Sequence, residues 1–161
     1  MSREQRFEQL IHENKALIHK VCRIYSITKD DRDDLFQEIV IQLWKAFNSF
    51  RAESKFSTWL YRIALNTAIS GLRKAKRADL SGADIYLVSD TDDIPDGPVN
   101  EENYMKMYAA ITLLNKIDKA IVMLYLEDRS YAEMEEILGM SYSNLRVKMT
   151  RIREKLKVLT K

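Results

Sequence analysis

Two amphipathic stretches joined by a glycine occupy residues 130–159. Ser130 and Glu133 have the spacing of a capping box, which predicts that a short helix starts at this serine. Gly139 suits the end of that helix, and Ser141 suits the start of a longer one. Steps of four, three, four and three separate the apolar residues of the second stretch, Leu145, Met149, Ile152, Leu156 and Leu159. The spacing traces one buried stripe, so the segment is predicted to form a helix, a short turn and a second helix.

The second of these helices is strongly basic. Residues 142–161 contain seven Lys or Arg residues and a single acid, Glu154. Polar residues on the face opposite the apolar stripe, and beside that face, are Asn144, Lys148, Arg151, Lys155, Arg146, Thr150, Arg153 and Lys157. Asn and Arg near the start of such a helix can pair with base edges, while later Lys residues meet phosphates. The pattern is typical of a DNA-binding helix-turn-helix; the alternative is an ordinary surface helix with a solvated basic face.

Composition favours an all-α protein without a disulfide. The 161 residues are 46% hydrophobic, with four glycines and two prolines, as suits a helical globular chain. Cys22 is the only cysteine, which excludes an internal disulfide and fits a reducing compartment. There is no apolar run of the roughly 18 residues that a membrane span needs, and the charged N-terminus lacks the apolar core of a signal peptide. We therefore expect a cytoplasmic protein.

Charge divides the chain into three parts, although the formal net charge is only +2. Residues 1–78 carry 15 Lys or Arg and nine acids, residues 79–102 carry eight acids and no Lys or Arg, and residues 103–161 carry 11 Lys or Arg and seven acids. The central part also holds both prolines, so it reads as a flexible acidic linker. Fully extended, it would reach roughly 80 Å. We expect two small helical domains, 1–78 and 103–161, joined by this linker.

The first domain is predicted to contain three helices. The first helix has an apolar face from Phe7 to Tyr25, and the second has one from Leu35 to Phe47. Ser57 is a plausible cap for a third helix, in which Trp59 and Leu60 face inward. The acids of KDDRDD suit the start of the second helix.

A basic track follows the loop before the third helix. Residues 54–78 contain six Lys or Arg and no acid, and Phe56, Trp59 and Tyr61 stand at the start of the track. Basic residues beside aromatic ones suit single-stranded nucleic acid, because bases stack on the rings and phosphates meet the charges. The alternative, which we favour for Trp59, is that the rings belong to the core. No catalytic set, metal cluster or phosphate-binding glycine loop appears, and His12 and His19 are expected to be surface or packing residues.

Three stretches together resemble one protein family. DDLFQEIVIQLWKAF resembles region 2.2 of the sigma-70 family of bacterial RNA polymerase sigma factors, FRAESKFSTWLYRIALNTAISGLRKAKR resembles regions 2.3 and 2.4, and LLNKIDKAIVMLYLEDRSYAEMEEILGMSYSNLRVKMTRIREKLK resembles region 4. They lie in the family's order and cover more than half of the chain, and the two-domain layout is similar to the extracytoplasmic-function (ECF) type. The resemblance implies a transcription initiation factor, not an enzyme, whose partners are core RNA polymerase, promoter DNA and an anti-sigma factor.

The resemblance also implies a role for each of several residues. Those matching the polymerase-docking surface are Asp34, Leu35, Gln37 and Glu38. Those matching the −10 element contacts are Phe56, Trp59, Arg62, Asn66, Ser70, Arg73, Lys74 and Arg77, with residues 50–55 as the loop that captures a flipped base. Those matching the −35 element contacts are Asn144, Arg146, Val147, Lys148, Thr150 and Arg151. No cofactor, metal or small-molecule substrate is implied.

Some residues depart from the family pattern. Leu65 replaces a common Arg, which removes a phosphate contact, and Ser70 stands where many relatives carry Asp or Asn. Leu114-Asn115 replaces the usual Leu-Pro at the start of region 4, and Val147 replaces a small polar residue. Two other functions stay open at this point: a stand-alone regulator that binds DNA without polymerase, and a helical adaptor that binds only protein.

Overall fold

The computed structural model describes residues 2–51, 55–78 and 101–160; of these, the side chains of residues 71–78, 101, 103 and 104 are outside the description. The predicted linker therefore falls outside it, except for its last two residues, which begin a helix. The elements are α1 (Arg3–Tyr25), α2 (Lys29–Ala46), a 3₁₀ turn η1 (Phe47–Ser49), α3 (Phe56–Ala78), α4 (Glu101–Thr112), α5 (Lys116–Leu126), α6 (Tyr131–Leu138) and α7 (Tyr142–Leu159). Every regular element in the described ranges is a helix, which confirms the all-α prediction.

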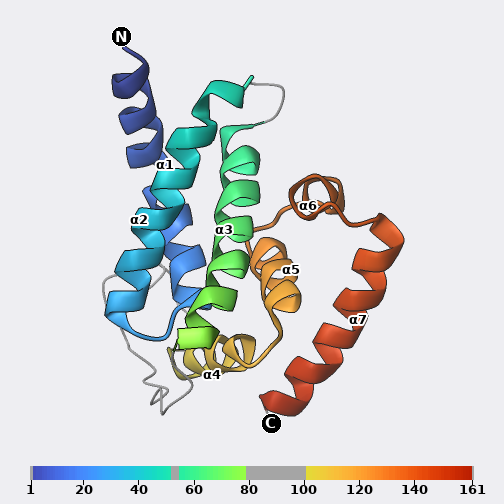
Figure 1. The fold of residues 1–161 in the computed structure, drawn as a ribbon. Coiled ribbons are helices and arrows are strands. Elements are labelled where there is room, and N and C mark those ends of the chain that lie inside the picture. The colour runs from blue at the N-terminus through green and yellow to red at the C-terminus, as the bar shows by residue number, and fades with distance from the viewer. Residues whose placement is uncertain (1, 52–54, 79–100, 161) are drawn as a thin grey trace.

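The first three helices lie side by side and form the N-terminal lobe (Figure 1). Local sequence explains where the first two begin. Ser2 and Gln5 form a capping box at α1, and the Thr28 hydroxyl accepts a hydrogen bond from the Asp31 backbone at α2. The buried residues of this lobe lie on the predicted apolar faces and include Ile18, Ile39, Leu43, Leu60 and Ala64.

The predicted cap at Ser57 is wrong. Helix α3 begins one residue earlier, at Phe56, and the Lys55 carbonyl accepts the first hydrogen bonds from the backbone of Thr58 and Trp59. Ser57 therefore lies within the first turn. Its hydroxyl accepts a hydrogen bond from a residue of the C-terminal half of the chain instead.

The C-terminal lobe contains α4 to α7, and the helix ends predicted from the sequence for α6 and α7 are confirmed. Ser130 and Glu133 form both hydrogen bonds of the predicted capping box. Gly139 ends α6 with a φ of 68°, in the left-handed region, and the Ser141 hydroxyl caps α7. Asn115, the departure from the Leu-Pro pattern, caps α5 by accepting a hydrogen bond from the Asp118 backbone at 2.9 Å.

The two lobes pack against each other in one molecule. Helices α5 and α6 contact α3, and α4 contacts α1. Figure 1 shows α5 beside α3, with α7 standing on the far side of α5. Among the described residues, buried apolar side chains from both lobes form a single hydrophobic cluster. The sequence pattern predicts two separate lobes, so their packing against each other is a finding of the structure.

Candidate nucleic-acid and polymerase interface

One face of α3 carries three of the predicted −10 residues in a line. Arg62, Asn66 and Ser70 follow one another by four residues, so they share a face of the helix, and all three are exposed. Three further members of the set, Arg73, Lys74 and Arg77, continue along α3, but their side chains are outside the described part of the structure.

Aromatic rings gather at the start of α3, next to the predicted base-capturing loop. Phe56 contacts Phe50 and Trp59, with ring centroids 5.4 Å apart in both pairs, and Phe50 lies 5.2 Å from Trp59. All three rings are half-buried and pack against the hydrophobic cluster. Phe56 and Trp59 therefore both support the core, and each ring keeps an exposed part; stacking of these rings on bases stays a prediction. Residues 52–54 of the loop are outside the described ranges.

Helix α7 presents most of the predicted −35 residues to solvent. Asn144, Arg146, Val147, Thr150 and Arg151 are exposed, and Lys148 is half-buried. The opposite face is the predicted apolar stripe. Its first three members, Leu145, Met149 and Ile152, are buried.

Two basic residues further along α7 hold this helix against α5. Arg153 donates a hydrogen bond to the Tyr125 hydroxyl at 3.0 Å, and its guanidinium lies 5.3 Å from the centre of the same ring. Lys155 lies 3.7 Å from the carboxylate of the buried Asp118. The sequence placed both cations on or beside the DNA face, whereas the structure gives them partners within the lobe.

The predicted polymerase-docking residues lie along α2. Asp34, Gln37 and Glu38 are exposed, while Leu35 is half-buried against the hydrophobic cluster. Ile41 on the same helix is also exposed, although it is not among the predicted docking residues. The signal was present, because Ile41 falls outside the apolar face formed by Ile39 and Leu43.

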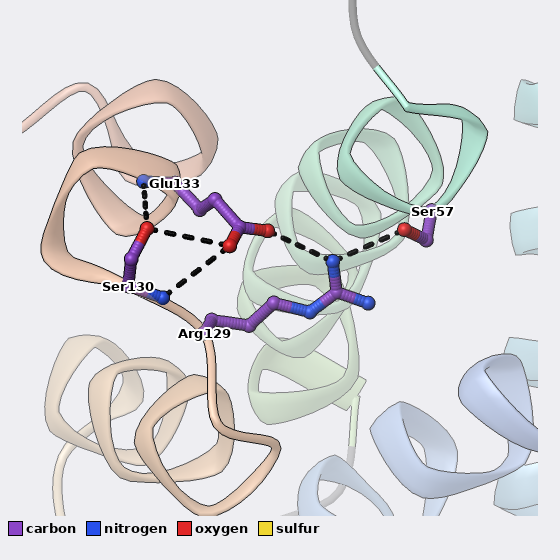
Figure 2. Close-up of polar contacts among 4 residues, drawn as sticks. All are labelled: Ser57, Arg129, Ser130 and Glu133. Atoms are coloured by element: carbon purple, nitrogen blue, oxygen red, sulfur yellow. Dashed lines mark hydrogen bonds and ion pairs between the residues drawn. The ribbon is translucent and has the colours of Figure 1, made fainter.

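A polar contact joins the lobes at the start of α3 (Figure 2). The Arg129 guanidinium donates hydrogen bonds to the Ser57 hydroxyl at 3.1 Å and to the Glu133 carboxylate at 3.0 Å. The same guanidinium lies 5.2 Å from the centre of the Tyr61 ring. Hydrogen bonding from Arg129 is the main cause that lowers the pKa of Glu133, which keeps the carboxylate charged at this contact.

A second group of contacts joins α1 to α5. The Lys20 ammonium lies 2.6 Å from the Glu127 carboxylate. The Tyr25 hydroxyl donates a hydrogen bond to the Lys116 carbonyl, and the Lys119 ammonium lies 5.6 Å from the Tyr25 ring centre. Burial raises the pKa of Tyr25, so this phenol stays protonated and remains a donor.

Within the described residues, no group of three or more His, Cys, Asp or Glu side chains could hold a metal ion. None of the helices in those ranges is long and apolar enough to cross a membrane. His19 stacks on Phe36 with ring centroids 4.7 Å apart, as the packing interpretation predicts. Burial lowers the pKa of His19, with smaller contributions from neighbouring cations.

Comparison with known proteins places this fold in one family. The model of sigma-70 region 2 matches residues 10–78, and that of sigma-70 region 4 matches residues 104–156. The chain is 30% identical over 152 residues to the ECF RNA polymerase sigma-E factor of Escherichia coli. The alignment covers 84% of this chain and 78% of that protein. The chain belongs to the sigma-70 family, in its ECF group. ECF RNA polymerase sigma factor SigW of Bacillus subtilis is 29% identical, over 94% of this chain and 87% of that protein.

Solved structures share the fold of this ECF sigma factor. The sigma factor RpoE from Bartonella quintana, solved in complex with the anti-sigma factor NepR, aligns with a TM-score of 0.73 at 20% identity and covers 96% of each chain. CnrH, solved in complex with the cytosolic domain of CnrY, aligns with a TM-score of 0.68 at 21% identity, over 98% of this chain and 89% of that one. The part of the chain that matches region 2 contains most of α1 and all of α2 and α3, and the part that matches region 4 contains most of α4, all of α5 and α6, and α7 up to residue 156. The family assignment supports a transcription initiation factor rather than a stand-alone regulator.

Proposed function

We propose that this sigma factor divides promoter recognition between its two lobes as the residue assignments predict. Residues 1–78 dock on core RNA polymerase through α2 and read the −10 element through α3. Residues 103–161 read the −35 element through α7. The observation that carries the proposal is the exposure of Asn66 on α3 and of Asn144 and Arg146 on α7, on faces that the hydrophobic cluster leaves free.

Opening of the −10 element would use the aromatic group at the start of α3. A base leaves the helical stack only if stacking and hydrogen bonds compensate for the loss of its neighbours, which amounts to a few kcal/mol. Phe56 and Trp59 offer partly exposed rings, and Asn66 offers a polar group two turns along the helix. Arg62 adds a cation for the backbone of the same strand.

Docking on polymerase would use the exposed side of α2. Asp34 and Glu38 lie one turn apart and supply negative charge, and Ile41 supplies an apolar contact beside them. Charges at such an edge contribute mainly to complementarity and to the rate of encounter.

Partners other than DNA and core polymerase follow from the same assignment. The two structural neighbours named above are solved as complexes, one with an anti-sigma factor and one with the cytosolic domain of CnrY. We infer that this chain also forms a complex with a protein partner, that this partner holds it inactive, and that the chain acts in the cytoplasm. It performs no catalysis of its own and needs no cofactor or small-molecule substrate, because polymerase carries out the chemistry.

The test compares one substitution at two places. Asn66→Ala and Asn144→Ala remove the same side chain from exposed positions in the two lobes. With core polymerase and a promoter of the host, Asn66→Ala should reduce permanganate reactivity of the −10 element more than binding of the closed duplex. Asn144→Ala should reduce duplex binding and leave opening of the bound complex normal. Identical behaviour of the two variants, or a wild-type protein that directs no specific transcript, would refute the proposal.

A further inference from the structure

The exposed face of α7 carries an apolar side chain among its basic residues. Val147 is 50% exposed, and it stands where the family resemblance expects a small polar residue. We propose that Val147 and Thr150 read the methyl groups of two adjacent thymines on one strand of the −35 element. The proposal deepens the proposed function and rests on it, because it requires that α7 enters the major groove of this element.

Packing within the protein does not explain Val147. The buried residues of α7 are Leu145, Met149 and Ile152, and Val147 lies outside the stripe that they form. Valine is also a weaker helix former than alanine or lysine, so an exposed valine inside a helix adds no stability of its own. One exposed apolar residue is ordinary on a protein surface. A ligand for Val147 therefore requires a second feature beside it, and the next turn of α7 supplies one.

Thr150 presents a methyl group beside Val147. The two residues are three positions apart, so their Cβ atoms lie about 5–6 Å from each other on one face of the helix. Thr150 is exposed, and its hydroxyl donates a hydrogen bond to the Arg146 carbonyl at 3.1 Å. The proton of this hydroxyl is thus bound by the backbone of α7 and is not available to a base. The group that Thr150 offers to an apolar partner is its methyl.

Neighbouring cations lie on both sides of Val147 along the helix. The Arg146 guanidinium lies 5.6 Å from the centre of the ring of Tyr142, which stands one turn earlier in α7. Arg151 is exposed one turn after Val147. Contacts from cations to phosphates fix the register of a protein on the duplex, whereas contacts to base edges carry the sequence information. We therefore expect the cations to hold α7 in the groove while the apolar pair faces the bases.

Thymine is the base whose major-groove edge suits these two side chains. Its C5-methyl is an apolar group, and the threonine methyl is among the protein groups that pair with it. The other three bases would place polar atoms against the valine. Residues about one turn apart on a groove-entering helix meet successive base pairs, as in zinc fingers. Val147 and Thr150 therefore match two adjacent thymines.

Deoxyuridine tests the contact directly, because it differs from thymidine only by the missing methyl group. Each thymine in the −35 element of a host promoter is replaced in turn, and competition binding gives the affinity of holoenzyme for the duplex. Wild-type holoenzyme should lose about fourfold in affinity at each of two adjacent thymines on one strand, and less than about twofold elsewhere. A fourfold change corresponds to ~0.8 kcal/mol, the usual gain from burying one methyl-sized group, at ~1.4 kcal/mol per tenfold.

One kind of substitution assigns each thymine to its side chain. Val147→Ser removes both methyl groups of the valine and should bind thymine and deoxyuridine equally at one position. Thr150→Ser keeps the hydroxyl, removes the methyl and should do the same at the neighbouring position. The matched control is Val158→Ser near the end of α7, where the valine is 71% exposed. This control should retain both preferences for thymine. Valine and serine have similar helix propensities, so the variants should match the wild type by circular dichroism.

Two results would overturn the methyl contacts. One is a wild-type holoenzyme whose affinity is unchanged by deoxyuridine at every thymine of the element. The other is retention of both thymine preferences in Val147→Ser or in Thr150→Ser. Failure of the proposed function would look different, because Asn144→Ala and Arg146→Ala would then also leave duplex binding unchanged. If those two variants weaken binding while deoxyuridine has no effect, α7 reads the element without its thymine methyl groups.

Discussion

Tyr142 and Arg146 lie one turn apart at the start of α7, the helix that we propose reads the −35 element. The Arg146 guanidinium lies 5.6 Å from the centre of the Tyr142 ring, and that ring meets Tyr131 of α6 edge-on at 5.2 Å. The first helix of the helix-turn-helix thus supports a side chain of the second through one exposed tyrosine. A long Arg side chain held in one direction loses less entropy when it pairs with a guanine.

Removal of this ring should therefore affect DNA sequence discrimination. Tyr142→Ala is expected to weaken discrimination by holoenzyme at the same −35 base pair that Arg146→Ala affects, by about two- to fivefold, because an exposed cation–π contact contributes roughly 0.5–1 kcal/mol. Competition binding with promoters altered at one −35 base pair at a time measures it. Tyr142→Phe keeps the ring and serves as the control. Losses that simply add in the double variant would show that the two side chains act independently.

Gly139 determines how α6 and α7 are joined. A Cβ at this position would meet no atom within 4 Å, so space does not require glycine here. The backbone does, because φ is 68° and residues with a Cβ adopt the left-handed region at a cost.

Gly139→Ala should therefore destabilise the protein by about 1–2 kcal/mol, the usual penalty for a left-handed alanine. Gly139→Asn should lose clearly less stability than Gly139→Ala, since Asn tolerates this conformation through local hydrogen bonds. Urea unfolding followed by circular dichroism compares the two. Equal losses in both variants would mean that the backbone conformation is not the cause.

The ends of helices could be predicted where short-range chemistry decides them. The capping box at Ser130, the glycine at 139 and the cap at Ser141 are confirmed, because each depends on residues three or four positions apart. The cap predicted at Ser57 is wrong, and the contact that this side chain makes is long-range. Its hydroxyl pairs with Arg129, 72 residues away, and no local pattern carries that information.

In the part of the chain that the structure describes, one hydrophobic cluster extends through both lobes, and a shared cluster favours unfolding in one step. Both tryptophans, Trp44 and Trp59, belong to region 2. Tryptophan fluorescence therefore reports the unfolding of region 2, while far-ultraviolet circular dichroism reports the helices of both lobes.

The two signals should change together when the free protein is heated or placed in urea. Arg129→Ala removes a contact between the lobes, and it should move the two midpoints apart or lower both. The control Lys15→Ala removes an exposed cation of α1, and the fluorescence and circular dichroism midpoints of this variant should still coincide. Well-separated midpoints in the wild type would contradict a shared unfolding unit.

The family, the helices and the exposed faces of α3 and α7 could be inferred from the sequence, because amphipathic spacing and the FSTWLYRIALN string carry them. The packing of region 4 on region 2 could not. Lys20 and Glu127 are separated by 107 positions, and each reads in the sequence as an ordinary surface charge. For Tyr61 the sequence left a nucleic-acid track and the core as alternatives, and the structure buries the ring beneath Arg129.

The contact between Lys20 and Glu127 joins two parts of one chain, so it has no dependence on how many copies the cell holds. Tethered partners experience a local concentration that dilution leaves unchanged, commonly in the millimolar range for short flexible tethers. Capture by polymerase, in contrast, follows mass action and rises with the amount of protein made. A change in the rate of synthesis would therefore alter how often the protein meets polymerase, and it would leave the contact between Lys20 and Glu127 unaffected.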